Sequence, residues 1–237
     1  MILILAEPDD PLAGSLQTRI GERGRPVRRL SERELMEETP IALERQGRRF
    51  GGFLRLPGGD VRVQDLSGVV VRISRRWWPS PSFDPSDQMF VYHETTAALF
   101  CLLAGLSCPV INRFDLGWWL RDPAHPELLR EELAERLGLR PDGMDGPGSP
   151  RRPLSVYAVD GRLIPASGAS APLAERLSGL SAALASWQAS SGLRICRLDL
   201  SGGDEPVLER LDPCPTLVDE APAVTEQIAA AALEMLS

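Results

Sequence analysis

The sequence predicts an α/β protein in which an open parallel sheet with helices is followed by a smaller α+β part. Three observations support this. The chain begins with the apolar run MILILA (1–6), and residues 11–24 then repeat apolar side chains at helical spacing as far as Gly24. A second strand is expected at residues 25–30. The chain therefore opens β-α-β, the usual start of a parallel sheet.

The middle of the chain continues this sheet. Residues 48–66 alternate apolar and polar side chains around the turn PGGD (57–60), which predicts a hairpin. We expect a strand at residues 68–76 with arginines at its carboxyl end. A mostly apolar helix at 89–106 and a buried strand at 108–113 follow.

The last part of the chain, from residue 126 onward, shows a different pattern of elements. We expect an amphipathic helix, a linker rich in glycine and proline, a hairpin, a helix, two strands and a final helix, at residues 126–139, 140–152, 154–167, 171–191, 193–200, 206–212 and 221–236. The predicted domain limits are 1–115, 116–152 for the helix and linker, and 153–237.

Composition narrows the classes of function. Of 237 residues, 43% are hydrophobic and 25% charged, which is ordinary for a globular domain, and no apolar run is long enough for a membrane span. The net charge of −7 argues against nucleic-acid binding. Four cysteines without a CxxC pair and two histidines exclude a zinc motif and favour a reduced, cytoplasmic setting.

The chain contains no lysine, because all 26 basic residues are arginine. This excludes a Schiff base, a pyridoxal-phosphate anchor, a phosphate-binding lysine and a lysine general base. Arginine can bind phosphate in bidentate fashion, but it does not lose its proton.

Polar residues at the carboxyl ends of two predicted strands form the first candidate site. Arg72, Arg75 and Arg76 could bind an anion at the edge where open α/β sheets hold ligands, together with Asn112 and Arg113 after the next strand. The alternative, which we favour, is a solvated strand end whose arginines pair with nearby carboxylates.

Two tryptophan pairs in or near loops form the second candidate, an interface for a partner or a dimer. They are Trp77, Trp78, Trp118 and Trp119. Burial beneath the loops is the alternative.

His93 and Glu94 are a weak candidate for an acid/base pair. Adjacent residues of a helix point about 100° apart, so they do not form a dyad by themselves, and a structural role is favoured.

The strand VLERLDPCPTL (207–217) delivers polar side chains to one face of a sheet. Side chains alternate along a strand, so Arg210 and Asp212 share one face while Glu209 and Leu211 point the other way. Asp199, on the preceding strand, is the third polar residue of this candidate site.

Several segments resemble the ATP-grasp superfamily, especially the ribosomal-protein-modifying glutamate ligases and the graspetide peptide maturases. The amino-terminal half resembles their pre-ATP-grasp domain, and the carboxyl-terminal part resembles the distal ATP-grasp region. The matching segments are DVRVQDLSGVVVRISRR, FVYHETTAALFCLLAGL with Glu94, CPVINR with Asn112, LAERLGLRPDG and LRICRLDLSGGDEPVLERLDPCPTL.

The resemblance implies a degenerate metal site. In the family, a Glu and an Asn of the final strand and an earlier Asp hold the magnesium ions that bridge the ATP phosphates. Alignment on the proline places Arg210 at the Glu, Asp212 at the Asn and Asp199 at the Asp. A second register places Glu209 at the ligand position and Leu211 at the Asn. Either register loses a ligand, and we expect Arg210 to form an ion pair with both aspartates where a metal would sit.

The central nucleotide-binding subdomain of the family has no counterpart, because only residues 144–153 separate the matching parts. We therefore expect a truncated, non-catalytic or repurposed member with no metal or cofactor, and Mg-ATP only if the truncation is misread. Its partners would be a second copy, a complete ATP-grasp ligase or a peptide substrate, in peptide modification or specialised metabolism.

Two alternatives remain open. One is a small enzyme, of ligase or acid/base type, with an arginine clamp for anions and with Asp199 and Asp212 as acid/base groups. The other is a plain flavodoxin-like ligand-binding protein. The arrangement of residues 199–212 discriminates between the scaffold and the enzyme. An ion pair of Arg210 with both aspartates and no cleft favours the scaffold, and an open acidic pocket with free carboxylates favours the enzyme.

Overall fold

The computed structural model describes residues 1–46, 49–56, 58–73, 79, 81, 83–113, 125–141, 154–166, 178–201 and 207–236. The chain divides into two compact units, Met1–Arg113 with Leu236, and Phe114–Met235 with Ser237. In the part of the chain that is described, no helix combines the length and the apolar character needed to cross a membrane.

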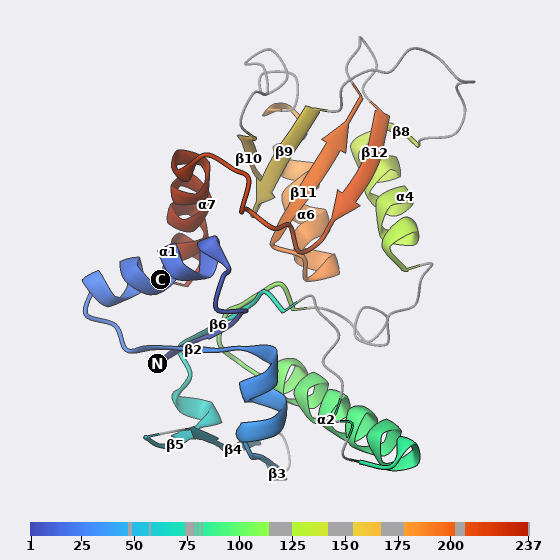
Figure 1. The fold of residues 1–237 in the computed structure, drawn as a ribbon. Coiled ribbons are helices and arrows are strands. Elements are labelled where there is room, and N and C mark those ends of the chain that lie inside the picture. The colour runs from blue at the N-terminus through green and yellow to red at the C-terminus, as the bar shows by residue number, and fades with distance from the viewer. Residues whose placement is uncertain are drawn as a thin grey trace. The chain divides into compact units, whose positions relative to one another are not determined.

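The first unit contains the predicted parallel sheet (Figure 1). Its strand order is β2-β1-β6-β7, with β1 at Ile2–Leu5, β2 at Val27–Leu30, β6 at Gly68–Val71 and β7 at Val110–Ile111. All residues of β1 and β6 are buried, as expected for inner strands of a parallel sheet. The predicted α/β class and the β-α-β opening are confirmed.

Helix α1 (Pro11–Glu22) begins where local chemistry predicts. Asp10 is the N-cap, and its Oδ1 atom accepts a hydrogen bond of 2.8 Å from the backbone N–H of Ala13. Pro11 occupies the first turn, where its missing N–H costs nothing. Gly24, with φ of 69°, lets the chain turn back toward β2.

A small antiparallel sheet lies between β2 and β6 in the chain. Its order is β3-β4-β5, with strands Ile41–Gln46, Arg49–Leu56 and Gly59–Arg62. The predicted hairpin is β4–β5. Strand β3 was not predicted, nor were the π-helical turn Glu34–Glu38 and the 3-10 turn Val63–Asp65. Helix α2 (Pro85–Gly105) packs on this sheet closely enough that a Cβ at Gly105 would lie 2.4 Å from the Phe50 ring.

The second unit contains a five-stranded sheet of order β10-β9-β11-β12-β8 (Figure 1). Its strands are β8 (Arg140–Pro141), β9 (Leu154–Val159), β10 (Arg162–Pro165), β11 (Ile195–Leu200) and β12 (Val207–Asp212). Its helices are α4 (His125–Leu137), α6 (Ser181–Ser191) and α7 (Pro222–Met235). β8 pairs in parallel with β12, and the other pairs are antiparallel.

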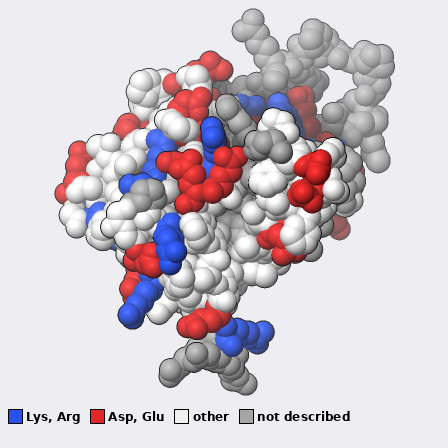
Figure 2. All heavy atoms as spheres, turned by 60° about the horizontal axis from the view of Figure 1, so that its bottom comes forward, with Lys and Arg blue, Asp and Glu red and all other residues white. Residues whose placement is uncertain are grey.

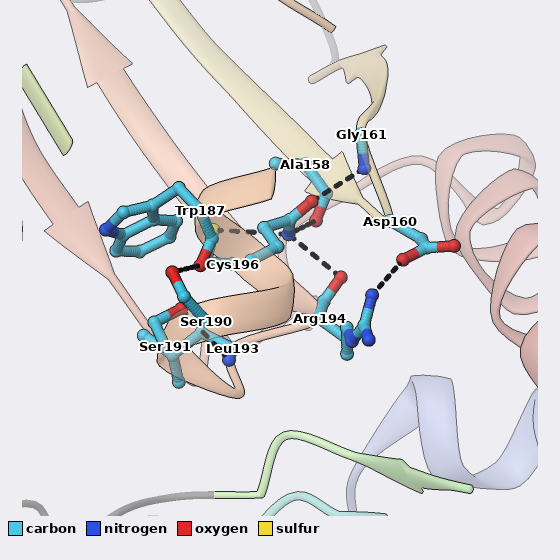
Figure 3. Close-up of polar contacts among 10 residues, drawn as sticks. Ala158, Asp160, Gly161, Trp187, Ser190, Ser191, Leu193, Arg194 and Cys196 are labelled. Atoms are coloured by element: carbon cyan, nitrogen blue, oxygen red, sulfur yellow. Dashed lines mark hydrogen bonds and ion pairs between the residues drawn. The ribbon is translucent and has the colours of Figure 1, made fainter. Parts of the chain in front are cut away.

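Gln188 connects α6 to the sheet through a buried amide. Its Nε2 donates to the Arg194 carbonyl at 3.0 Å and lies 3.4 Å from the Ala158 carbonyl, while its Oε1 accepts from the Gly161 N–H at 2.7 Å. Figure 3 shows the residues around this amide, with Asp160 and Arg194 joined by an ion pair at one side. The β9–β10 turn and the start of β11 are thus held against one helix.

The structure places α4 in the second unit, whereas the sequence analysis set residues 116–152 apart as a helix and linker. Leu133 and Ala134 of α4 are buried, and Arg130 Nη1 donates to the Leu208 carbonyl of β12 at 3.1 Å. The sequence analysis missed this packing because many residues of the helix are charged. A narrow apolar stripe is nevertheless enough to pack a helix against its neighbours.

Candidate functional site

The arginine that follows β6 does not form an open anion site. Arg72 is only 3% exposed, and its Nε lies 2.8 Å from Oδ2 of Asp10, the residue that also caps α1. Arg72 therefore bonds to its own unit, which agrees with the carboxylate pairing of the favoured alternative but in a buried rather than a solvated position. Arg75 and Arg76 lie outside the described residues.

The residues after β7 are also engaged within their unit. Asn112 is fully buried and adopts a left-handed backbone conformation with φ of 58°. The Nη2 of Arg113 donates to the Leu106 carbonyl at 3.0 Å. Among the described residues, this strand edge therefore offers no convergent set of free guanidinium groups.

The described residues do not assemble His93 and Glu94 into a site. His93 and Glu94 are exposed on α2, and the described residues provide neither of them with a hydrogen bond or an ion pair. The His93 ring contacts the Tyr92 ring edge-on, with centroids 5.6 Å apart. The four predicted interface tryptophans, Trp77, Trp78, Trp118 and Trp119, lie outside the described residues.

The polar face of the five-stranded sheet brings together the remaining candidates. Strand register places Asp199 opposite Arg210 on one side and Ser155 on the other. Directly opposed residues of an antiparallel pair share a face, so these side chains lie on one surface. The same register places Arg197 opposite Asp212 and Tyr157.

Asp199 is held by a guanidinium and a hydroxyl. It is 7% exposed, and its Oδ1 accepts a hydrogen bond of 2.6 Å from the Ser155 hydroxyl. Nη2 of Arg197 donates to Oδ2 at 3.2 Å, and Nε lies 3.1 Å from Oδ1 without the direction of a hydrogen bond. Burial by itself lowers the pKa of Arg197, but Asp199, Asp212 and Tyr157 together raise it by more, so the net pKa is raised.

The prediction that Arg210 forms an ion pair with both aspartates is wrong. Arg210 is exposed and makes no ion pair with a described residue, while Arg197 occupies the carboxylate of Asp199. The register of β12 shifts between Asp199 and Leu200, so that Glu209 is an extra residue in this strand. A bulge of this kind re-aims the side chains beside it.

Asp212 ends β12 and shapes the turn after it. Its Oδ1 accepts a hydrogen bond of 3.1 Å from the backbone N–H of Cys214, the local bond typical of an aspartate at a turn. One carboxylate oxygen of Asp212, a predicted site residue, therefore binds a backbone N–H two residues further along the chain.

Tyr157 and Glu220 extend the polar face and were missed by the sequence analysis. The Tyr157 hydroxyl donates to Glu220 Oε1 at 2.8 Å. Burial raises the pKa of Tyr157 and the bond to Glu220 raises it further, whereas Arg197 opposes both effects. Alternation in β9 pairs Ser155 with Tyr157 on one face, but the sequence carries no signal that joins β9 to residue 220.

The donors that the described residues of this face provide do not fit magnesium. Mg²⁺ takes oxygen ligands in octahedral geometry and is bound through carboxylates. The described residues contain no group of three acidic, histidine or cysteine side chains placed to hold a metal ion. Arg197 covers the carboxylate of Asp199, and the register places the cation Arg210 across from it.

Comparisons with known proteins give structural matches only. No family model matches the chain, and no curated protein matches it. The macrocyclase MdnC from Microcystis aeruginosa MRC, bound with precursor peptide MdnA, has a TM-score of 0.73 at 13% identity, over 98% of this chain and 99% of that chain.

Two further solved structures are ligases, and the name of the first includes the term ATP-grasp. A RiPP-associated ATP-grasp ligase from Chryseobacterium gregarium, in complex with ADP and a leader and core peptide, has a TM-score of 0.67 at 11% identity, over 98% of this chain and 96% of that chain. D-alanine-D-alanine ligase from Aeromonas hydrophila has a TM-score of 0.53 at 11% identity, over 99% of this chain and 98% of that chain.

The chain has an ATP-grasp-like fold. The mixed architecture, a parallel sheet in one unit and antiparallel sheets in both, agrees with these matches. Within this ATP-grasp-like fold, the face formed by β9, β11 and β12 gathers Ser155, Tyr157, Arg197, Asp199 and Asp212, and we take this face as the candidate functional site.

Proposed function

We propose that this ATP-grasp-like chain is a non-catalytic or repurposed protein that acts as a binding, scaffold or partner subunit in peptide modification. The observation that carries the proposal is the ion pair of Arg197 with Asp199, with Arg210 opposite the same carboxylate. Two guanidinium groups now stand on the face where the resemblance expects metal ligands.

The physical argument concerns charge. A guanidinium cannot ligate a cation, and its positive charge repels one. Removing Arg197 from Asp199 to admit a metal would break an ion pair in which Asp199 is almost fully buried, and this costs free energy. The absence of lysine adds to the argument, because a phosphate lysine is also missing.

The comparisons support a peptide as the partner. MdnC is described as bound with a precursor peptide, and the ligase from Chryseobacterium gregarium as bound with a leader and core peptide. We extend this partner class to the present chain as part of the proposal, along with a complete ATP-grasp ligase or a second copy of the chain.

The first experiment separates the proposal from a catalytic alternative. Thermal shift and calorimetric titration are run with ATP, ADP and a non-hydrolysable ATP analogue, each with and without Mg²⁺. A ligand at 100 times its Kd stabilises the folded state by about 2.7 kcal/mol, which is readily seen as a melting shift. We expect no magnesium-dependent shift. A magnesium-dependent shift would overturn the proposal and favour an enzyme that uses the arginines as an anion clamp and Asp199 and Asp212 as acid/base groups.

A gain-of-binding variant tests directly whether the two guanidinium groups exclude a metal ion. In Arg197→Met with Arg210→Glu, the guanidinium groups are removed and a carboxylate is restored opposite Asp199. We expect Mn²⁺, used as a probe for Mg²⁺, to raise the melting temperature of this variant but not that of the parent chain. The matched control is Arg197→Met with Arg210→Met, which removes the same charges without adding a ligand. If neither variant nor control responded to Mn²⁺, the arginines would not be what excludes the metal, whereas a response of both would show that removing the arginines is sufficient without an added carboxylate.

A further inference from the structure

Surface charge does not single out a second binding site on the face that Figure 2 shows. Among the described residues of this face, acidic and basic side chains are interspersed with wide uncharged areas. A ligand of one strong charge sign is therefore not favoured there. The β9–β10 turn of the second unit is more informative, because its two residues form a pair with covalent chemistry of its own.

The β9–β10 turn consists of Asp160 and Gly161 alone. Strand register pairs Val159 with Arg162, which leaves these two residues between the strands. Their φ angles of 48° and 81° are those of a type I′ turn, for which Asp–Gly is a preferred sequence. Asp–Gly is also the aspartyl pair that cyclises most readily to a succinimide, because glycine places no side chain beside the attacking nitrogen.

The cyclisation uses the backbone nitrogen of Gly161 as the nucleophile. This nitrogen loses its proton and bonds to Cγ of Asp160, and one carboxyl oxygen leaves as water. A second water molecule then opens the ring at either carbonyl carbon, which restores aspartate or gives isoaspartate. In isoaspartate, the main chain runs through Cβ and Cγ. One water leaves and one enters, so the reaction needs no oxidant, reductant or other reactant.

Glycine at position 161 is required by packing. Its φ is positive, and a Cβ there would lie 2.7 Å from Cβ of Ala185 and 2.9 Å from the Ser181 carbonyl oxygen, both on α6. A larger residue would therefore clash with the helix. The close approach of the turn to α6 thus fixes a reactive Asp–Gly pair at this position.

The buried amide of Gln188 holds the Gly161 nitrogen in its protonated form. The N–H of Gly161 donates to Oε1 of Gln188 at 2.7 Å, and Gln188 is fully buried. Loss of the proton would leave a buried negative charge facing the lone pairs of Oε1, which is costly. The amide cannot turn to offer its Nε2 without losing the bond of that atom to the Arg194 carbonyl, at 3.0 Å.

The other reacting group, the carboxylate of Asp160, is held by the start of β11. One of its oxygens forms an ion pair with the Arg194 guanidinium, and the Asp160 N–H donates to the Arg194 carbonyl at 3.0 Å. Figure 3 shows this ion pair beside Gly161. The Asp160 side chain is 43% exposed, so water reaches the carboxyl group. Geometry rather than dryness therefore restrains the reaction.

We propose that Asp160–Gly161 is an isoaspartate-forming site that the Gln188 amide keeps closed in the folded chain. The proposal goes beyond the proposed function, because it concerns a covalent change and holds whether or not the chain binds a peptide or a nucleotide. Isomerisation would add one atom to the main chain of a two-residue turn. Val159 and Arg162 would then no longer meet in register.

The first test compares the folded chain with the chain unfolded in guanidinium chloride. Both are incubated in water enriched in oxygen-18, so that each opening of the ring adds one heavy oxygen, and peptide mapping reads the label at Asp160. We expect the folded chain to react slower by about tenfold or more, because the turn must first leave α6. Equal rates in the two states would overturn the proposal.

The second test removes the acceptor at position 188. Gln188→Met keeps a side chain of similar volume, and we expect it to accelerate the reaction at Asp160 about tenfold over the parent chain. Leu184→Ala is the matched control, because Leu184 is a buried residue of the same helix and its truncation loosens α6 without removing the amide. Circular dichroism and thermal melting establish that both variants are folded.

Two results of this comparison would contradict the role of Gln188. One is a Gln188→Met chain that reacts no faster than the parent. The other is a Leu184→Ala chain that reacts as fast as Gln188→Met, which would show that general loosening of α6, rather than the amide, opens the site.

A third test keeps Gln188 in place and changes the leaving group. Asp160→Asn forms the same ring with ammonia as the leaving group, and peptide mapping reads the product as deamidation. It also removes the negative charge that pairs with Arg194. We expect the folded variant to deamidate slower than the same variant unfolded, by about tenfold or more, because Gln188 still holds the Gly161 nitrogen. Equal rates would overturn the proposal, even if Gln188→Met did not fold.

Discussion

Arg197 and Asp199 lie two residues apart on β11, so their side chains share a face and form a local ion pair. We expect Arg197→Met to lower the free energy of unfolding by about 2 kcal/mol, because it leaves the carboxylate of Asp199 with little solvent and only the Ser155 hydroxyl. Urea unfolding followed by circular dichroism measures this change.

The control for this prediction is Arg210→Met, at an exposed position. We expect its effect to stay within about 0.5 kcal/mol, as for most surface substitutions. If the two variants were equally destabilised, Arg210 would contribute as much to stability as Arg197, which would contradict the assignment of Asp199 to Arg197 alone. A double-mutant cycle with Asp199→Asn then isolates the coupling between the two side chains.

Tyr157 introduces a dependence of stability on alkaline pH. Its pKa is raised in the folded state, mainly by burial and then by Glu220. Unfolded tyrosine ionises near pH 10, so the contribution of Tyr157 is fully present below about pH 10 and is lost as the pH rises above it.

We expect the parent chain to lose stability between pH 9 and 11 more steeply than Tyr157→Phe, which cannot ionise. Urea unfolding at several pH values measures the two slopes. The buried thiol of Cys196, whose pKa is raised to about 12 by burial, is present in both proteins, so it cancels in the comparison. Parallel pH profiles would contradict the raised pKa of Tyr157.

At the scale of elements, the β3–β4 pair depends on a glycine. Gly52 has a φ of 133°, and a Cβ there would lie 2.0 Å from the carbonyl oxygen of Ala42 on β3. We expect Gly52→Ala to destabilise the first unit by about 2 kcal/mol or more, since both backbone strain and a clash with backbone oppose it. Hydrogen exchange of the β3–β5 segment reports the loss of pairing.

Gly51→Ala is a closely matched control, because it makes the same substitution one residue earlier in β4. A Cβ at Gly51 would meet its nearest atom, Gln64 Oε1, at an ordinary 3.5 Å. We expect this variant to keep the hydrogen-exchange pattern of the parent. Equal loss of protection in both variants would mean that side-chain volume in general, rather than the conformation of Gly52, limits the strand.

At the scale of the whole molecule, the absence of lysine means that no side chain among the 237 residues carries a primary amine. We expect an amine-reactive ester to form no stable amide with any of these side chains at neutral pH, as measured by peptide mapping. Amide-forming labels on side chains would contradict this expectation.

Much of the architecture could be predicted because it follows from local periodicity. The β-α-β opening, the hairpins at β4–β5 and β9–β10 and the strands β11 and β12 all show regular alternation or helical spacing. Strand β3 was missed because the segment around it has few turn signals and its partner strand contains Gly51 and Gly52, which interrupt the alternation. Its pairing depends on contacts across the sheet.

The sequence by itself determined that lysine chemistry is excluded, and that Arg210 and Asp212 share one face of their strand while Leu211 points the other way. These are properties of composition and of a period of two, and they need no neighbour. Only the tertiary structure decided which arginine neutralises Asp199, and that Tyr157 meets Glu220. Those contacts depend on strand register, on the bulge in β12 and on a loop distant in sequence, because local periodicity holds no information about which residues meet across strands.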